Sequence, residues 1–130
     1  MEIPVKLYYS REHEWASVDG NRVTVGITDY AQEQLGDIVY IELPVEGDRI
    51  QAKETLGVIE SVKAVSDIYA PISGEILEVN QDLMEHPEWV NQEPYGKGWM
   101  LVVAMEDAGD LEQMMDAQGY EAFLEEQEER

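Results

Sequence analysis

Apolar and polar residues alternate along much of the chain, which is the period-two pattern of half-buried β-strands. Val23 and Val25 alternate with polar residues, and the Asp-Gly pair at 19–20 before them is a turn signal. We therefore predict a β-hairpin over 14–28. Further strands are predicted at 38–44, 55–62, 64–70, 73–79 and 96–105, with a turn and a short strand at 45–54.

Two shorter stretches of the chain carry helical signals instead. Thr28 or Asp29 can cap a helix that Gly36 ends, which predicts a short helix near 28–35. A single helical turn is predicted at 82–86, because a proline follows it. Neither stretch is long enough to form a separate helical layer.

From residue 107 onward the spacing of apolar residues becomes helical. A capping-box pattern begins at Asp110, and Leu111 and Met115 lie on one helical face. Gly119 is predicted to end this helix. A last short amphipathic turn follows, and then a charged tail at 125–130 whose helix we expect to fray.

Many short strands with glycine and proline turns, followed by helices, predict a mainly β fold. We expect a small sandwich of two sheets, or a flattened β-barrel, with the short helix and the C-terminal helix added to it. The chain has 130 residues, which suits one domain. The prediction is a single domain over 1–130, with its core at about 8–124 and an acidic tail at 125–130.

The charge of the chain limits the partners it can bind. Eight Lys and Arg residues stand against 29 Asp and Glu residues, which gives a net charge of −21. This charge opposes binding to nucleic acid or to an anionic membrane, and it favours partners with basic docking surfaces. No apolar run is long enough to span a membrane, and no targeting segment is recognisable. We expect a cytoplasmic protein of bacterial or archaeal type, or a mitochondrial one if a transit peptide has been removed.

Few residues of the sequence suit catalysis. There is no cysteine, and the two histidines, His13 and His86, are far apart with no metal-ligand spacing. No glycine-rich nucleotide motif or nucleophile motif is present. Carboxylates are so abundant that no catalytic pair stands out. The sequence therefore predicts no catalytic residues and no metal site.

One lysine occupies an unusual place in this acidic chain. Lys63 is the only basic residue between Lys53 and Lys97, and it lies where two predicted strands meet. A tight turn there would present its amine to solvent between the small apolar side chains of Val62 and Ala64. An amide-linked prosthetic arm needs such an amine, on a flexible stem above a stiff support. A solvated edge lysine is the alternative interpretation.

The segments around this lysine resemble the H proteins of the glycine cleavage system. The similar segments are HEW (13–15), VTVGITDYAQEQLGDIVYIELP (23–44), ESVKAVSDIYAP (60–71) and NQEPYGKGWM (91–100). The resemblance covers the chain from about Tyr8 to Leu124. It implies a lipoyl- and biotinyl-domain-like fold with (R)-lipoate attached to Lys63, whose hairpin is recognised through Glu60, Ser61, Val62 and Ala64.

The family resemblance also implies a non-catalytic carrier with several enzyme partners. The P protein, a pyridoxal-phosphate glycine decarboxylase, loads the aminomethyl group of glycine onto the arm. The T protein, an aminomethyltransferase, removes this group, and the L protein, dihydrolipoamide dehydrogenase, reoxidises the arm. A lipoate ligase or an octanoyltransferase would install the cofactor.

Carboxylates of this family protect the loaded arm, and the matching positions here are Glu14 and Asp67. Such groups would hold an ammonium through charge-assisted hydrogen bonds in a cleft that excludes water. His13 and Glu12 are further candidates. Glu12 stands where the family usually has a serine, so the hydrogen bond of that serine is an open question.

Other carrier functions share the lysine and the fold. A biotin carrier usually has methionine on both sides of the lysine, and a lipoate carrier of 2-oxoacid dehydrogenases usually reads Asp-Lys-Ala. The residues around Lys63 favour neither. An H-like protein of a lipoate-relay or sulfur-metabolism pathway fits better than these two. An unmodified interaction module is the alternative from a different class.

Overall fold

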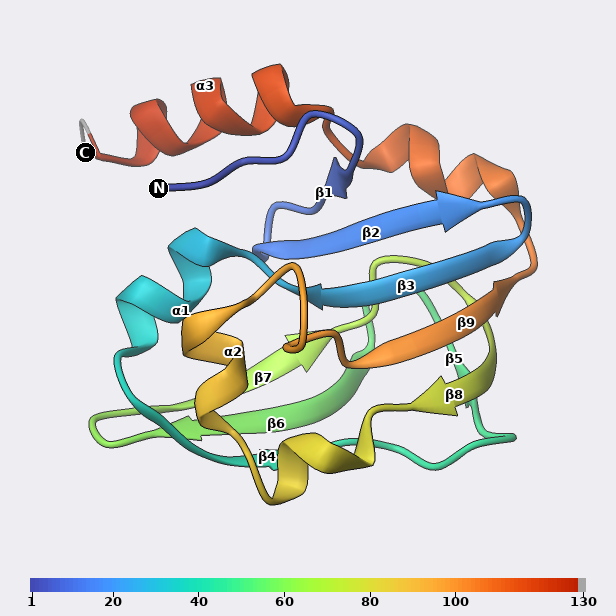
Figure 1. Ribbon diagram of the computed structural model, residues 1–130. Helices are drawn as coiled ribbons and strands as arrows, with labels where there is room; N and C mark the ends of the chain where they lie inside the picture. Colours follow the sequence, from blue (N-terminus) through green and yellow to red (C-terminus); the bar gives the residue numbers. More distant parts are fainter. Residues whose placement is uncertain (129–130) are drawn as a thin grey trace.

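The computed structural model describes residues 1–128, which form two antiparallel sheets with helices around them (Figure 1). The larger sheet has the strand order β1-β2-β3-β9-β8-β5, and the smaller has the order β4-β6-β7. The larger sheet consists of β1 (Tyr8–Tyr9), β2 (Glu14–Asp19), β3 (Arg22–Ile27), β5 (Arg49–Ile50), β8 (Gly74–Val79) and β9 (Leu101–Met105). The smaller consists of β4 (Ile38–Glu42), β6 (Thr55–Ser61) and β7 (Val65–Tyr69). The predicted mainly β fold of two sheets is confirmed, as a flattened arrangement that does not close into one barrel.

Apolar side chains from both sheets meet in one core between them. Val23 and Val25 of β3 and Leu101 of β9 are fully buried, and Ile41 and Ile59 of the smaller sheet join them. The period-two pattern of the sequence places these side chains on the inner faces. The predicted hairpin is also confirmed, since β2 pairs with β3 across the turn and Gly20 has a φ of 64°.

The short helix α1 (Asp29–Leu35) begins and ends at the residues that the sequence indicated. The Thr28 hydroxyl accepts a hydrogen bond from the backbone N–H of Ala31, at 3.2 Å. Gly36 follows the last turn with a φ of 80°, and its N–H donates to the carbonyl of Gln32. This helix leads directly into β4, so its end fixes where β4 starts.

The segment after β8 contains one element that the sequence did not predict. The 3₁₀ helix η1 (Gln81–Met84) matches the predicted single turn. A second helix, α2 (Glu88–Gln92), follows Pro87 immediately. The sequence predicts that helical structure ends before this proline, but a proline is favourable at a helix start, where its missing N–H has no helical partner.

The C-terminal prediction was wrong in its boundaries. The structure has a 3₁₀ helix η2 (Ala108–Gln113), and α3 (Ala117–Glu128) then includes Gly119 instead of ending there. The side chain of Asp116 accepts a hydrogen bond from Gly119 N–H at 2.7 Å, so this glycine lies in a capped first turn. The helix also continues through most of the expected frayed tail, and residues 129–130 lie outside the described part.

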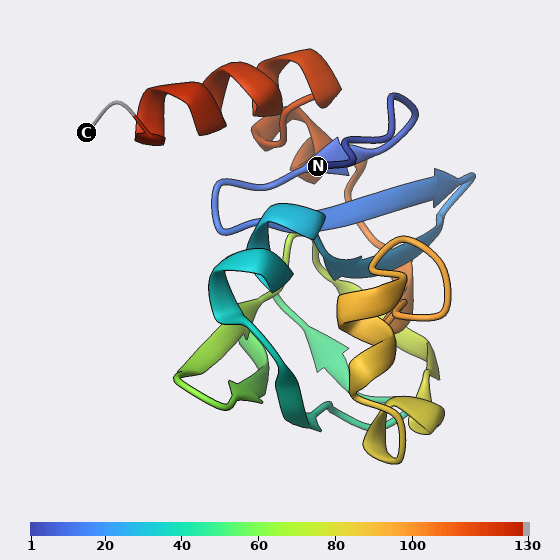
Figure 2. The same cartoon turned by 60° about the vertical axis from the view of Figure 1, so that its left-hand side comes forward.

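Helix α3 lies near the start of the chain, beside β1 at the edge of the larger sheet (Figure 2). An aromatic cluster joins them. The rings of Tyr9 and Tyr120 stack with their centroids 4.6 Å apart, and the Tyr120 hydroxyl lies 2.7 Å from the Thr28 hydroxyl. This contact joins α3 to the cap of α1.

Among residues 1–128, no helix has the length and apolar character needed to cross a membrane.

Candidate functional site

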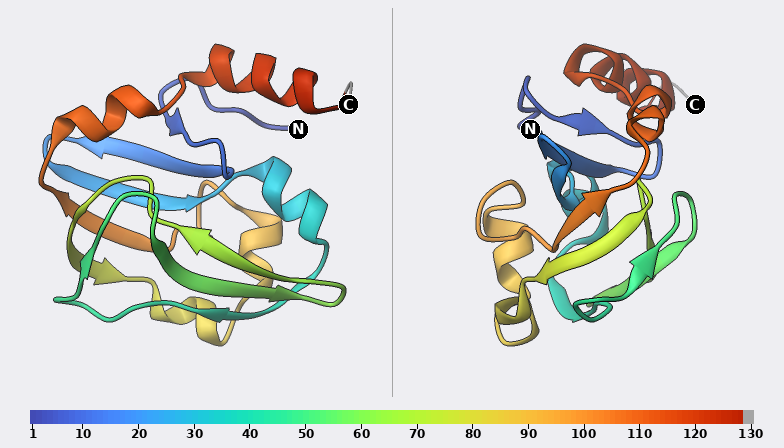
Figure 3. Two further views of the ribbon diagram at one scale, coloured as in Figure 1. Left: turned by 180° about the vertical axis from the view of Figure 1, so that it is seen from behind. Right: turned by 90° about the vertical axis from the view of Figure 1, so that its right-hand side faces the viewer.

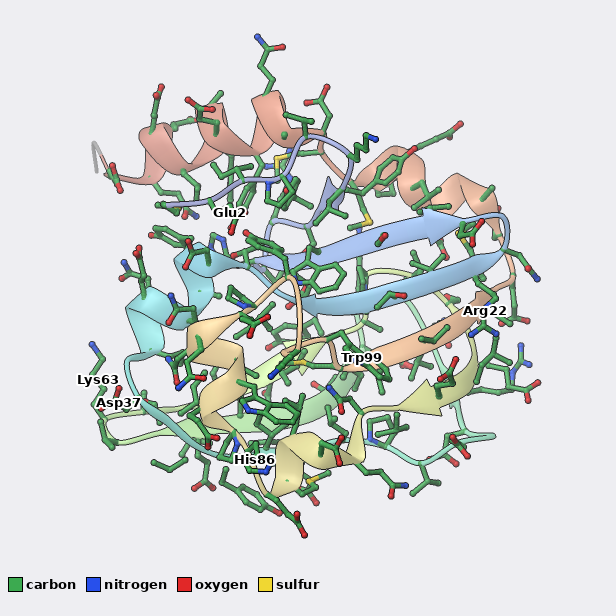
Figure 4. The ribbon with its side chains drawn as sticks, viewed as in Figure 1. Glu2, Arg22, Asp37, Lys63, His86 and Trp99 are labelled. Carbon is green, nitrogen blue, oxygen red and sulfur yellow. The ribbon has the colours of Figure 1, made fainter. Side chains whose placement is uncertain are left out.

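Lys63 lies at the tip of the hairpin between β6 and β7, and its side chain extends into solvent (Figure 4). The buried Ser61 organises the turn beneath it. Its hydroxyl accepts hydrogen bonds from the backbone N–H groups of Ala64 at 3.0 Å and Lys63 at 3.3 Å. The N–H of Ser61 donates to the carbonyl of Ala64, at 2.8 Å. The turn therefore has a defined conformation while its lysine is exposed, as the sequence predicted.

The hairpin tip is supported by the junction between α1 and β4. The N–H of Val62 donates to the carbonyl of Asp37 at 3.0 Å, and a Cβ atom added to Gly36 would lie 3.6 Å from Cε of Lys63. The end of the Lys63 stem thus lies beside the C-terminal end of α1, and Figure 4 shows Lys63 near Asp37. Two segments far apart in sequence hold the attachment point.

A cleft of about 180 Å³ lies between the loop before β2 and the end of β7. It is lined by Ser10, Arg11, Glu12, Glu14, Lys53, Tyr69, Ala70, Pro71, Gln113 and Met114. These residues come from four separate segments of the chain. The cleft therefore exists only in the folded protein.

Glu14 is the buried carboxylate of this cleft, with 3% of its surface exposed. The Ser10 hydroxyl donates to Oε1 of Glu14 at 2.5 Å, and the N–H of Tyr69 donates to Oε2 at 3.4 Å. Burial raises the pKa of the Glu14 carboxyl to about 7, against the lowering effect of these hydrogen bonds, and the charge of Glu12 adds to the rise. Glu14 is thus a carboxyl that gains or loses its proton near neutral pH.

The structure places the other predicted arm-stabilising residues differently. Glu12 lines the cleft beside Glu14. His13, with a φ of 70°, turns its ring toward the aromatic cluster, and its Nδ1 lies 2.8 Å from the Tyr120 hydroxyl. Asp67 is exposed on β7 and is not among the residues that line the cleft. Glu14 and Glu12 are therefore brought together, whereas His13 and Asp67 lie apart from them.

Ser10 is the functional candidate that the sequence interpretation missed. Ser10 also accepts a hydrogen bond from the N–H of Glu14 at 3.0 Å, and its own N–H donates to the carbonyl of Glu14 at 2.9 Å, so three bonds join the two residues. The position of Ser10 four residues before Glu14 was the available signal, since short-range serine–backbone bonds are common in loops.

The described residues hold no group of three or more side chains suited to a metal ion.

Residues 7–127 match the sequence model of the family described as Glycine cleavage H-protein. A protein named Glycine cleavage system H protein from Anaeromyxobacter sp. (strain K) is 56% identical over 128 residues, covering 98% of this chain and all of that protein. The chain belongs to the glycine cleavage H-protein family.

Further members of the H-protein family agree with this assignment. A glycine cleavage system H protein from Carboxydothermus hydrogenoformans is 54% identical over 125 residues, covering 96% of each chain. The crystal structure of a glycine cleavage system H protein from Mycobacterium marinum has a TM-score of 0.85 and 38% identity, over 92% of this chain and 97% of that one. These matches confirm the family resemblance and favour an H protein over a biotin carrier.

Proposed function

We propose that this chain, as a single domain, is the lipoyl-carrying shuttle of the glycine cleavage system, with lipoate attached to Lys63. The observation that carries the proposal is the exposed Lys63 on a turn fixed by Ser61, in a chain that matches H proteins over almost its full length. The bound lipoate would supply the dithiolane that receives the aminomethyl group of glycine from the P protein and yields it to the T protein. The chain itself would supply position and protection.

The cleft fits the protective part of this role. Glu14 presents a buried carboxylate whose two oxygens each already accept one hydrogen bond, so its orientation is fixed. When ionised, this carboxylate would bind an ammonium group at the end of the arm through a charge-assisted bond, with Glu12 adding negative charge nearby. A buried carboxyl with a raised pKa is costly to ionise unless a cation enters beside it, which supports a cationic ligand here.

The remaining parts of the proposal concern partners. The P, T and L proteins would act on the end of the arm, and a lipoate ligase or an octanoyltransferase would acylate Lys63 after recognising Glu60, Ser61, Val62 and Ala64. Asp67 and His13 stay as predicted contributors to arm binding. The bacterial relatives are consistent with the predicted cytoplasmic placement.

The attachment site can be tested with a matched pair of lysine variants. Unmodified protein is incubated with lipoate ligase, ATP and lipoate, and the product is mapped by peptide mass. We expect one lipoyl group on Lys63, its loss in Lys63→Arg, and normal labelling in Lys53→Arg, which removes another exposed lysine. Labelling that survives Lys63→Arg, or a wild-type chain that stays unlabelled, would contradict the proposal.

The shuttle role needs a second assay with the lipoylated protein. With the P protein and glycine, the lipoylated chain should support release of carbon dioxide, and adding the T protein with tetrahydrofolate should release ammonia. A lipoylated chain that the P protein does not use would favour the lipoate-relay or sulfur-metabolism alternative. The two assays thus separate attachment from the pathway that uses it.

A further inference from the structure

Exposed apolar side chains gather around Lys63 on the smaller sheet. Val62 and Val65 flank the tip and are 70% and 67% exposed, and Val39 and Tyr40 of β4 are 54% and 48% exposed. Single exposed apolar residues are ordinary, but four on one small sheet form a patch of the kind that binds partners. We call the surface formed by Val39, Tyr40, Val62 and Val65 the hairpin face.

The strand register explains how the hairpin face is built. Tyr40 lies opposite Glu60, and Glu60 lies opposite Val65, so these three residues form one row across all three strands. Residues directly opposite each other in a sheet point to the same side. The pairing of β4 with β6 is irregular between Ile38 and Tyr40, which leaves both Val39 and Tyr40 exposed.

No helix lies in front of this sheet when the molecule is seen from behind (Figure 3, left). In that view β7, β6 and β4 cross the front, and the hairpin tip projects beyond the rest of the fold. The inner side of the same sheet contributes Ile41 and Ile59 to the core. The row from Tyr40 to Val65 is therefore on the outer side.

Apart from Lys63, the charged residues around the hairpin face are acidic. The next row on the same side contains Glu42, Val58 and Asp67. Within the three strands and the tip, Lys63 is the only basic residue. A partner that covers this surface would therefore match it best with an apolar centre flanked by lysine or arginine.

The position of the acylated atom indicates which enzyme must contact the hairpin face. An enzyme that acylates Lys63 acts on Nζ, which a four-carbon stem keeps close to the hairpin backbone. The active site of this enzyme must therefore contact the residues beside the tip. Enzymes that act on the distal end of an arm attached to Lys63 have no such requirement, because the arm extends their reach.

We propose that the hairpin face, including Tyr40 and Val39 of β4, is the docking surface of the enzyme that acylates Lys63. This inference rests on the proposed function and extends the recognition surface beyond the tip to a strand some twenty residues earlier in the sequence. Tyr40 and Val65 supply apolar contact, and Glu42 and Glu60 supply the acidic edge.

The test compares acylation of two double variants that each remove two exposed apolar side chains. One changes Tyr40→Ser and Val65→Ser in the hairpin face, and the control changes Val5→Ser and Val45→Ser, which are exposed elsewhere. Unmodified proteins are lipoylated by lipoate ligase with ATP and lipoate, and kcat/KM is measured by intact mass. We expect a loss of at least about tenfold for the first variant, mainly in KM, and a change within about twofold for the control.

A charge variant and a second assay complete the test. Glu42→Lys should raise KM for acylation, because it opposes a basic partner surface. The Tyr40→Ser, Val65→Ser variant, once lipoylated with excess ligase, should react with the P protein and glycine at the wild-type rate. Wild-type acylation kinetics in that variant would overturn the inference, and so would a defect confined to the reaction with the P protein. A wild-type chain that the ligase cannot acylate would overturn the proposed function itself.

Discussion

The pair of Ser10 and Glu14 sets the chemistry of the cleft at the scale of single residues. A buried carboxyl would be neutral over most of the pH range without donors, and here Ser10 and the backbone of Tyr69 supply them. The sequence indicated Glu14 through the family resemblance. It did not indicate Tyr69, because the contact between β7 and the loop before β2 forms only in the tertiary structure. Ser10 was missed although it lies only four residues before Glu14.

Removing the Ser10 hydroxyl should move the titration of Glu14. Ser10→Ala takes away a hydrogen bond that favours the ionised form, so the pKa of Glu14 should rise further above 7. We expect a rise of about one pH unit, in line with a hydrogen bond to a charged group. NMR titration of the Glu14 side-chain carbon measures it, and Ser10→Thr, which keeps the hydroxyl, should restore the wild-type value. An unchanged pKa in Ser10→Ala would contradict this assignment.

The raised pKa of Glu14 also predicts a pH dependence of stability. Between pH 4.5 and about 7 the unfolded chain releases this proton while the folded chain keeps it, so the free energy of unfolding falls as pH rises through that window. Glu14→Gln cannot titrate. The stability of the variant relative to the wild type should therefore increase by up to about 3 kcal/mol across the window. Denaturant unfolding at several pH values measures this difference, and parallel stability curves for the two proteins would contradict it.

Substitution of the two predicted arm-stabilising acids should have unequal effects. Glu14→Gln and Asp67→Asn should both permit lipoylation of Lys63, because neither lies at the hairpin tip. Both are expected to shorten the lifetime of the loaded arm in water, with the larger effect from Glu14→Gln, since Glu14 is buried in the cleft and Asp67 is exposed. The rate of ammonia release without the T protein measures this lifetime. An unchanged lifetime in Asp67→Asn would remove Asp67 from the site.

At the scale of elements, local signals in the sequence identified most strands and the first helix. The period-two pattern located β3, β4, β6, β7 and β8, and the caps located α1. Among the helices, the failures were α2, η2 and the start of α3, where capping by Asp107 and Asp116 and a proline at a helix start decide the boundaries. Such short helices depend on a few local hydrogen bonds and on packing, which apolar spacing alone does not reveal.

The end of α1 gives a prediction at this scale. Gly36 has a φ of 80° and a ψ of −156°, so Gly36→Ala would place a side chain on a backbone conformation that is essentially restricted to glycine. We expect a loss of about 1 to 3 kcal/mol in the free energy of unfolding. The added Cβ would be only in ordinary contact with Lys63, so lipoylation should continue. Urea unfolding measures the loss, and Gln34→Ala, an exposed change within the same helix, is the control. Equal stability of the Gly36→Ala variant and the wild type would contradict the capping role.

The net charge of −21 acts at the scale of the whole molecule. Its sign was readable from the sequence, but its distribution was not, because only the folded structure places β4 beside β6 and β7 in the sheet that carries Lys63. These strands and the tip contain no other basic residue. An acidic surface of this kind should steer basic partners during encounter. The two-sheet arrangement was predicted from the strand pattern and from the family resemblance, whereas the unequal sizes of the sheets follow from long-range pairings such as β3 with β9.

The charge predicts that partner encounter depends on salt. The rate at which the P protein loads the lipoylated chain should fall as sodium chloride rises from low concentration, because the screening length shrinks to about 10 Å at 0.1 M. Initial rates at subsaturating protein concentration measure the effect. A loading rate that is constant from low salt to several hundred millimolar, on the order of full screening, would show that steering contributes nothing.

The most direct test of the central claim is the intact mass and peptide map of the protein purified from its native cells. The account predicts a single lipoyl amide, located on Lys63, with no other lysine modified. A bare Lys63 in cells with an active lipoylation system, or biotin at this position, would contradict it.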